Sequence, residues 1–245
     1  MHSRTVQWTL VVLLTMAISQ IFAQEKTIRL KKGQVLSIIG ATFHSREAQQ
    51  KARPAYFSKV FPLAQKYSFS PQINFTRDAA NNDDFLPDAF GIHTWNSQQQ
   101  RKIFQKEKIW PSLKALRPEY WKHLRIATFE INENQTITFQ NGKVYQFYYI
   151  WFYGYEKDQV NFEKYRSNMK KTSGELGGKS IIRLKGDGFE ALNNDRCPDL
   201  IGIIEWPNVE AHQQYLASKA FQENQHLFQA AVAEYQSYLA HANFE

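Results

Sequence analysis

Only one cysteine, Cys197, occurs in the 245 residues of this chain. A single cysteine leaves no partner for an internal disulfide, so the fold must be held by packing. A nucleophilic role for Cys197 would need a basic partner, and its neighbour Arg196 is no proton acceptor, so we expect a small structural residue. With 11 glycines, 8 prolines and 43% hydrophobic residues, the composition is that of a globular chain.

Motifs of the common catalytic and cofactor sites are missing as well. The chain contains no H-E-x-x-H, no paired cysteine ligands, no glycine-rich phosphate loop and no G-x-S-x-G. The sequence therefore indicates neither a metal nor a nucleotide, and we expect no cofactor.

Acidic residues are in deficit, since 23 aspartates and glutamates stand against 30 lysines and arginines and leave a net charge of +7. The basic residues are scattered along the chain, whereas nucleic-acid binding usually concentrates them in one patch. We therefore expect a solvated basic surface and no nucleic-acid partner.

An apolar stretch at the N-terminus has the form of a targeting signal. Residues 1–23 combine an early positive charge at Arg4, an apolar core and the small residue Ala23 before a polar stretch. These are the three parts of a secretory signal peptide. A retained membrane anchor is the alternative, but the core is far shorter than the roughly 20 apolar residues that a bilayer requires. We expect an exported protein, periplasmic or secreted, with no transmembrane span.

A nine-residue segment occurs twice, at residues 87–95 and 198–206, and five of its positions are identical in the two copies. The copies lie 111 positions apart, and each runs from Pro-Asp to a Trp that precedes a helix-period segment. This pattern is typical of a strand that leads into a helix. The chain is interpreted as a tandem duplication, with a first repeat over residues 24–135 and a second over residues 136–245.

Both repeats show the element order β-α-β-β-α-β, which is that of the ferredoxin-like fold. The predicted strands are residues 35–43, 72–75, 87–95 and 124–131 in the first repeat and 144–155, 179–184, 198–206 and about 235–240 in the second. The predicted helices are residues 45–67 and 158–169, and one after each of the caps Ser97 and Asn208. Residues 78–84 and 185–195 are predicted to be loops.

Each repeat also has an extra leading strand, at residues 27–30 and 136–139, that is predicted to pair by a hairpin with the strand after it. Along residues 144–155 nearly every side chain is apolar or aromatic, so both faces of this strand should be buried. The sequence therefore predicts an α+β fold in which two tandem ferredoxin-like repeats pack sheet to sheet as an intrachain α+β barrel, and so a monomer or a weak homodimer.

Residues 202–211 and 215–221 resemble a strand and helix of the dimeric α+β-barrel proteins. They are most similar to a branch of unknown function with the pattern I-E-F-P-S…A…W-Y-x-S-x-x-Y, in a superfamily that includes antibiotic-biosynthesis monooxygenases, muconolactone-type isomerases and ethyl-tert-butyl-ether-degradation proteins. The resemblance implies a cavity for a small organic molecule between sheet and helices, used with or without a cofactor. The branch often has an Arg seven residues after the last aromatic, and this position is Arg117 in one repeat and Phe228 in the other.

His93 and Glu205 are the predicted catalytic residues, because each lies just before the Trp of its repeat and could serve as a general base in a partly buried position. The alternative is that Glu205 is hydrogen-bonded inside the fold and that His93 packs as a polar-tipped aromatic.

Six further residues are predicted to bind the substrate: Arg117, His44, Trp95, Trp206, Tyr149 and Trp151. Arg117 would hold a carboxylate or phenolate, or else pair with Glu119. The aromatic residues are more often core than ligand-binding. Because the first repeat has His93 and Arg117 where the second has Ile204 and Phe228, we expect any site to lie in the first repeat.

Two classes of function remain. The first is a barrel that binds a small, partly aromatic molecule or organic acid, with or without cofactor-independent catalysis of a monooxygenase or isomerase type. The second is a structural or interaction module whose cavity has been filled. A haem protein is a weaker third idea, since chlorite dismutases place a ligand His on a helix of their second repeat and residues 158–176 contain no His.

The targeting signal gives a first testable prediction. If residues 1–23 are removed on export, mass spectrometry of the native product should find a mature chain that begins at about Gln24. Recovery of a chain that still carries Met1 to Ala23 would contradict it.

Overall fold

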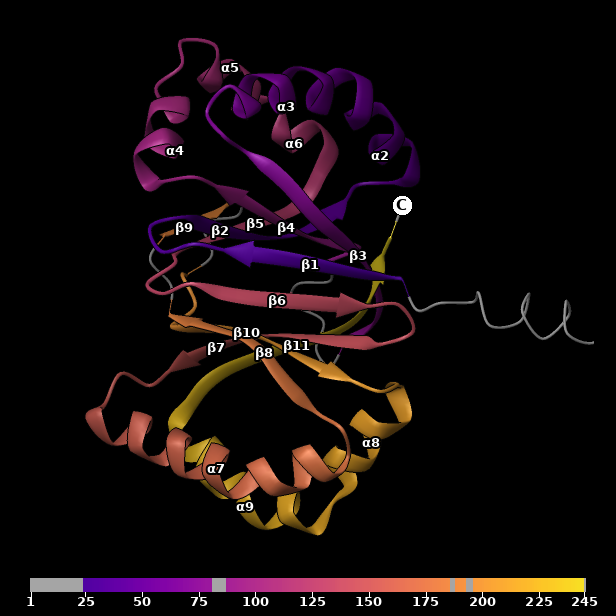
Figure 1. Cartoon of the computed structure of the whole chain (residues 1–245), viewed down its shortest axis with the longest axis vertical. Coiled ribbons are helices and arrows are strands. Elements are labelled where there is room, and N and C mark those ends of the chain that lie inside the picture. The colour runs from indigo at the N-terminus through magenta and orange to yellow at the C-terminus, as the bar shows by residue number, and fades with distance from the viewer. Residues whose placement is uncertain (1–23, 81–86, 186–187, 193–195, 245) are drawn as a thin grey trace, which may run out of the picture.

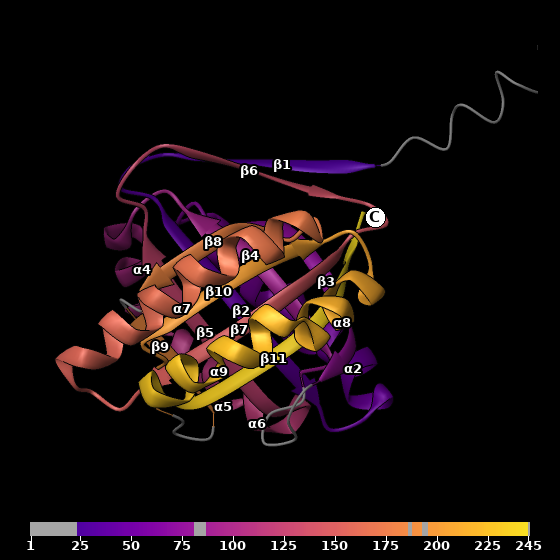
Figure 2. The ribbon, with the colours of Figure 1, turned by 90° about the horizontal axis from the view of Figure 1, so that it is seen from below.

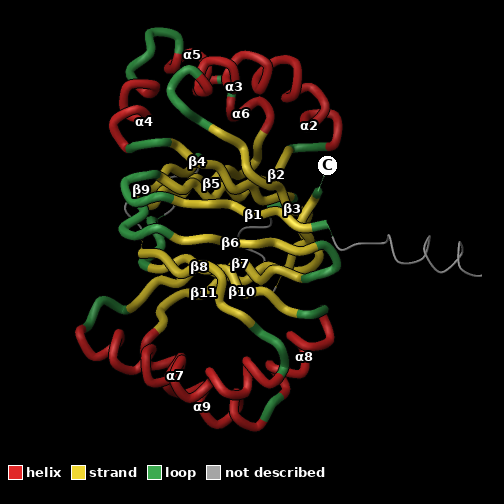
Figure 3. The backbone as a smooth tube through the Cα atoms, viewed as in Figure 1, coloured by secondary structure: helices red, strands yellow, loops and turns green. Residues whose placement is uncertain are grey.

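The structure of the chain, a computed structural model, describes residues 24–80, 87–185, 188–192 and 196–244. The predicted signal peptide lies outside the described residues. Helices form the two outer layers of the molecule, and strands lie between them (Figure 1, Figure 3).

The helices of the first repeat form one outer layer and those of the second repeat the other (Figure 1). The first layer consists of α2 (Arg46–Ala52), the π-helical turn η1 (Arg53–Phe57), α3 (Ser58–Gln65), α4 (Gln98–Gln105), α5 (Trp110–Ala115) and α6 (Arg117–Tyr120). The second consists of α7 (Glu156–Glu175), α8 (Val209–Ala217) and α9 (Lys219–Ala231). In the described part of the chain, no helix has the length and apolar character to cross a membrane.

Strands of both repeats join in one antiparallel sheet. The first repeat supplies β2 (Val35–Phe43), β3 (Ser70–Ala80), β4 (Ala89–Trp95) and β5 (Trp121–Glu130). The second supplies β7 (Val144–Phe152), β8 (Lys179–Lys185), β9 (Gly188–Ala191), β10 (Leu200–Trp206) and β11 (Val232–Asn243). Within the described ranges the order is β8-β10-β7-β11-β3-β4-β2-β5-β9, which contains the ferredoxin-like strand order once in each repeat.

The two halves of the sheet bury their apolar faces against each other. Phe90 on β4 stacks on Phe147 on β7 with ring centroids 4.2 Å apart and planes at 4°, and Phe75 on β3 meets the Phe147 ring edge-on at 5.0 Å. Tyr145, Phe147, Tyr149 and Trp151 belong to this inter-sheet core, while Tyr148 and Ile150 on the other face of β7 pack under the helices of the second repeat. The prediction that both faces of this strand are buried in an intrachain barrel is therefore confirmed for residues 144–152, whereas Tyr153 and Tyr155 lie beyond the strand and are exposed.

Hydrogen bonds between the repeats extend the sheet at two places. The C-terminal strand β11 pairs with β3 of the first repeat, and β9 of the second repeat pairs with β5. The prediction of a loop over residues 185–195 was wrong for residues 188–191. The reason is that Phe189 packs against the inter-sheet core while the neighbouring backbone finds partners on β5.

The predicted hairpins of the leading strands were also wrong. The strands β1 (Glu25–Leu30) and β6 (Gln135–Gln140) pair with each other, with Ile28 opposite Ile137. Their inward side chains Ile28, Leu30, Ile137 and Phe139 belong to the inter-sheet core. The two strands form a separate ribbon at one end of the barrel (Figure 2), and their inward side chains extend the inter-sheet core there.

The single helix predicted over residues 45–67 is divided into α2, η1 and α3. Proline lacks a backbone N–H and interrupts the regular hydrogen-bond ladder, and Pro54 lies at the start of the π-helical turn. The strand predicted at residues 72–75 is also longer and runs from Ser70 to Ala80, because β3 pairs with β4 along its first part and with β11 along its second.

The inter-sheet core predicts that the first repeat will not stand alone. A truncated chain that ends at Glu133 would expose the inner face of its sheet, including Phe90, and would leave β3 and β5 without their partners β11 and β9. We expect it to associate or aggregate. Light scattering coupled to size-exclusion chromatography would test this, and a stable, well-behaved monomer would contradict the importance of the inter-sheet core.

Candidate functional site

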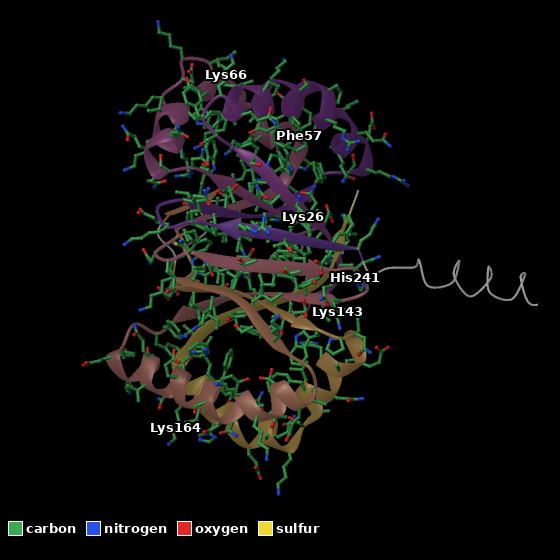
Figure 4. All side chains as sticks on the ribbon, in the orientation of Figure 1. Lys26, Phe57, Lys66, Lys143, Lys164 and His241 are labelled. Atoms are coloured by element: carbon green, nitrogen blue, oxygen red, sulfur yellow. The ribbon has the colours of Figure 1, made fainter. Side chains whose placement is uncertain are left out.

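A cavity of about 950 Å³ lies between the helices and the sheet of the first repeat. Its floor comes from β2, β3, β4 and β5, and its walls come from the helices of the first layer. The lining is mostly apolar and aromatic and includes Phe57, which lies in that helical layer (Figure 4). The size is at the upper end of the range usual for small-molecule sites.

A comparison of the repeats explains why the cavity is in the first. The sheet registers align β2 with β7, β4 with β10 and β5 with β11. Three lining residues of the first repeat have larger counterparts in the second: Ser37 corresponds to Gln146, Ile39 to Tyr148 and Leu124 to Tyr235. The larger side chains occupy the corresponding volume, so a cavity opens where the small ones stand.

The counterparts in the second repeat also satisfy one another by hydrogen bonds. The Gln146 amide donates to the Tyr235 hydroxyl at 3.0 Å and to the Ser237 hydroxyl at 2.9 Å, and its carbonyl oxygen accepts from Trp206 Nε1 at 3.0 Å. Tyr148 lies so close over Gly202 that a Cβ on that residue would approach its hydroxyl to 2.1 Å. The second repeat is thus a packed and hydrogen-bonded version of the space that is open in the first.

Two polar groups in the open cavity lack such partners. Ser37 and His93 are cross-strand neighbours on β2 and β4, and both line the cavity. Ser37 Oγ and His93 Nδ1 are buried and, among the described residues, have no hydrogen-bond partner. The imidazole meets the ring of Phe69 edge-on at 4.9 Å. Burial lowers the pKa of His93 to about 4, so the ring is neutral at physiological pH and one of its nitrogens is an acceptor.

Charged residues gather at another part of the lining. Arg117 is buried, donates from Nε to the Tyr56 hydroxyl at 2.8 Å, pairs with the carboxylate of Glu190, and lies 5.0 Å from the centroid of the Trp110 ring. Lys114 also pairs with Glu190, at 2.9 Å. Glu190 lies on β9, so the second repeat supplies an acidic residue to the cavity of the first. The expected alternative partner Glu119 is not the one that Arg117 meets.

Two effects act in opposite directions on Glu190. Burial favours the protonated carboxyl, but Arg117 and Lys114 outweigh this and hold the pKa of Glu190 below its ordinary value. Nearby, Arg101 lines the cavity from α4. Burial lowers the pKa of Arg101, and no hydrogen bond or ion pair joins its guanidinium to any residue that the structure describes.

The structure brings three of the predicted site residues to the cavity, namely His93, Trp95 and Arg117. The other five lie elsewhere. Trp206 is enclosed in the second repeat, Tyr149 and Trp151 belong to the inter-sheet core, Glu205 accepts from the Tyr145 hydroxyl at 3.2 Å, and His44 donates to the Pro118 carbonyl oxygen at 2.9 Å.

Sequence reasoning did not single out Ser37, Arg101 or Glu190. For Ser37, comparing the aligned repeats position by position would have shown a small residue opposite Gln146. Glu190 gave no such signal, because it reaches the site through a strand in a segment that looked like a loop.

The donor set does not fit a haem in the second repeat. The helix α7 has no His, the Tyr165 hydroxyl is 3.1 Å from that of Tyr215, and aromatic rings such as Phe162 and Phe228 pack in the interior. Among the described residues, no group of three or more His, Cys, Asp or Glu side chains is placed to hold a metal ion.

Comparison with solved structures identifies the class of fold. An anthrone oxidase-like protein aligns with a TM-score of 0.55 and 13% identity over 89% of this chain and 94% of its own. A mutant chlorite dismutase from Candidatus Nitrospira defluvii aligns with a TM-score of 0.52 and 9% identity over 87% of this chain and 93% of its own. At these identities the likeness shows the fold alone: this chain has the architecture of the ferredoxin-like α+β-barrel proteins.

The match to a sequence family covers a smaller part of the chain. Residues 147–242, which fall within the second repeat, match the family described as "Domain of unknown function (DUF1330)". No curated protein matches the chain. The match covers the packed repeat, which contributes Glu190 to the cavity, and the function of the family is unknown, so the match assigns no role to the residues of the site.

The Glu190 cluster yields a prediction about stability. Glu190→Gln removes the charge that compensates the buried Arg117, and we expect a loss of about 2 kcal/mol in the free energy of unfolding at neutral pH. Because the pKa of Glu190 is lowered in the fold, this stabilisation is complete above its ordinary value of 4.5 and is lost as the pH falls through the lowered pKa.

Urea unfolding at several pH values would measure the effect. Glu163→Gln is the matched control, since Glu163 is half-exposed and pairs with Arg166 and Arg183 on the surface, where pairs contribute less than about 1 kcal/mol. A loss in Glu190→Gln no larger than in the control, or one that persists in acid, would contradict the assignment.

Proposed function

We propose that this protein binds a small aromatic molecule in the cavity of the first repeat and that Ser37 and His93 form hydrogen bonds with a polar group of that molecule. One observation carries the proposal: two buried polar atoms without partners, Ser37 Oγ and His93 Nδ1, belong to neighbouring residues in the wall of a cavity of about 950 Å³. A buried polar group without a partner costs about 1–3 kcal/mol, and a ligand that supplies the missing partner recovers that free energy.

The lining supports an aromatic ligand. Phe57, Phe61, Trp95 and Trp121 line the cavity, and aromatic rings pack well against planar molecules. The fold neighbour described as anthrone oxidase-like takes its name from a polycyclic aromatic ketone, which is in keeping with this choice. The open cavity also favours ligand binding over the alternative of a structural module with a filled barrel.

His93 is the residue through which binding could lead to chemistry. A neutral imidazole can accept the proton of an acidic C–H beside a carbonyl while the electron pair of that bond moves onto the carbonyl oxygen as an enolate. Return of the proton at another carbon gives an isomer and regenerates His93. With a pKa of about 4 the imidazole is a weak base in the empty cavity, but the negative charge formed beside it raises the pKa as the proton transfers.

The setting of this activity is part of the proposal. The N-terminal signal pattern supports export to the periplasm or the medium. Because the two repeats already cover each other's sheets, we propose a monomer or a weak homodimer, with a small molecule as the partner and no nucleic acid.

The test uses the second repeat as a source of substitutions. Ser37→Gln together with Ile39→Tyr introduces the counterparts Gln146 and Tyr148, and His93→Ile introduces the counterpart Ile204. We expect the double variant to fill the cavity and each variant to bind a panel of hydroxylated and ketonic polycyclic aromatics at least about tenfold more weakly than the parent. Calorimetry and quenching of tryptophan fluorescence would report binding, and thermal melts would report folding.

His226→Ile is the matched control, because His226 is exposed on α9 of the second repeat. It should bind as the parent does. If the cavity variants fold and still bind as tightly as the parent, or if the parent binds none of the panel, the proposed site is wrong.

A further inference from the structure

We propose that the ligand of this cavity carries an acidic group and that Arg101 holds it. This inference rests on the proposed function and extends it from an aromatic ligand to an aromatic acid. The candidate cation from sequence is Arg117, but in the structure Arg117 is paired within the fold, whereas Arg101 is not paired with any residue that the structure describes.

Arg117 is already committed within the fold. Its Nε donates to Tyr56, its terminal nitrogen pairs with Glu190, and its guanidinium lies over the ring of Trp110. The side chain is only 7% exposed. A ligand carboxylate would have to displace Glu190 from this pair, so Arg117 is a structural cation that fixes β9 of the second repeat to the cavity of the first.

Arg101 is placed differently. It lies in the first turn of α4, which begins after the cap Ser97, whose hydroxyl accepts from the Gln100 backbone N–H at 3.2 Å. Its side chain lines the cavity, and the described part of the protein offers the guanidinium no hydrogen-bond or ion-pair partner. A half-buried guanidinium has five N–H donors in a planar fork, and a carboxylate matches that fork with two parallel hydrogen bonds.

The local balance of charge also favours an anion. Arg53, Arg101 and Arg117 line the cavity together with one carboxylate, that of Glu190. Arg53 is exposed to solvent, whereas Arg101 is half-buried, and both Glu190 and Arg117 act electrostatically on Arg101. Two positive charges therefore remain uncompensated beside a mostly apolar cavity. In such surroundings an opposite charge is attracted more strongly than in water.

The second repeat provides an independent comparison. The helix position that corresponds to Arg101, 111 residues on, is His212, and the one that corresponds to Arg117 is Phe228. His212 is buried against Trp206, and burial lowers its pKa, so it carries no charge at neutral pH. The cations thus accompany the open cavity and are replaced by neutral side chains where the space is packed.

One cavity reaches both Arg101 and the pair formed by Ser37 and His93. A ligand that satisfies both sets has an acidic group on one side and a hydroxyl or carbonyl on another, with apolar rings between them. A hydroxynaphthoate is a probe of this form, and the corresponding hydroxynaphthamide has the same shape without the charge.

The experiment measures the affinity of both probes for the full-length protein and three variants by calorimetry. Arg101→Gln should weaken binding of the hydroxynaphthoate about tenfold to a hundredfold and leave the hydroxynaphthamide unchanged, whereas Arg101→Lys should restore part of the loss. Lys102→Gln, which removes a charge from an exposed neighbour on the same helix, should change neither. Added salt should weaken the acid and not the amide.

The outcomes separate the two proposals. If the parent binds neither probe, the proposed function fails and the assignment of Arg101 fails with it. If the parent binds both probes and Arg101→Gln weakens them equally, or weakens neither, the cavity binds aromatic molecules but Arg101 is not the residue that holds an acidic group.

Discussion

Burial of one apolar sheet face by another is the constraint on which the rest of this structure depends. The ferredoxin-like unit covers only one face of its sheet with helices, and here the other face carries large rings such as Phe75, Phe90 and Phe147. Each repeat supplies the cover for the other, and the contact is reinforced where β11 pairs with β3 and where β9 pairs with β5. With the inter-sheet core packed in this way, the cavity found among the described residues lies mainly on the helical side of the first repeat's sheet.

On that side the repeats differ, and the difference is a matter of a few side chains. Where the first repeat has Ser37 and Ile39 beside an open volume, the second repeat has Gln146 and Tyr148. There the side chains fill the equivalent volume, and Gln146 joins a hydrogen-bonded cluster. In the open repeat, the same backbone leaves Ser37 and His93 buried without partners and leaves Arg101 facing a cavity. Smaller residues on the same sheet framework thus leave space for a small molecule. Because these residues are too short to reach the neighbouring polar groups, some of those groups face the cavity without hydrogen-bond partners.

The duplication and the sheet-to-sheet barrel could be predicted because they leave periodic signals: a repeated Pro-Asp to Trp segment and a strand apolar on both faces. Three of the site residues could be predicted as well, since His93, Trp95 and Arg117 lie on the repeated strand or near the expected end of a helix. The remaining features of the fold and the site depend on tertiary contacts that the sequence does not reveal. The pairing of β1 with β6 joins strands that are far apart in sequence, and nothing in either strand distinguishes that partner from a neighbouring hairpin. Glu190 meets Arg117 because it lies on a four-residue strand that pairs with β5. The sequence of this short strand does not indicate that pairing.

Joining the repeats in one polypeptide also removes a symmetry constraint. In a dimer of identical subunits, any residue that opens one pocket opens both, and any residue that braces one side braces both. Here positions 37 and 146 can change independently, although they occupy equivalent places in the sheet register. The first repeat can therefore keep an open cavity beside the buried, unpaired Ser37 Oγ and His93 Nδ1, while the second repeat fills the equivalent space with Gln146, Tyr148 and Tyr235.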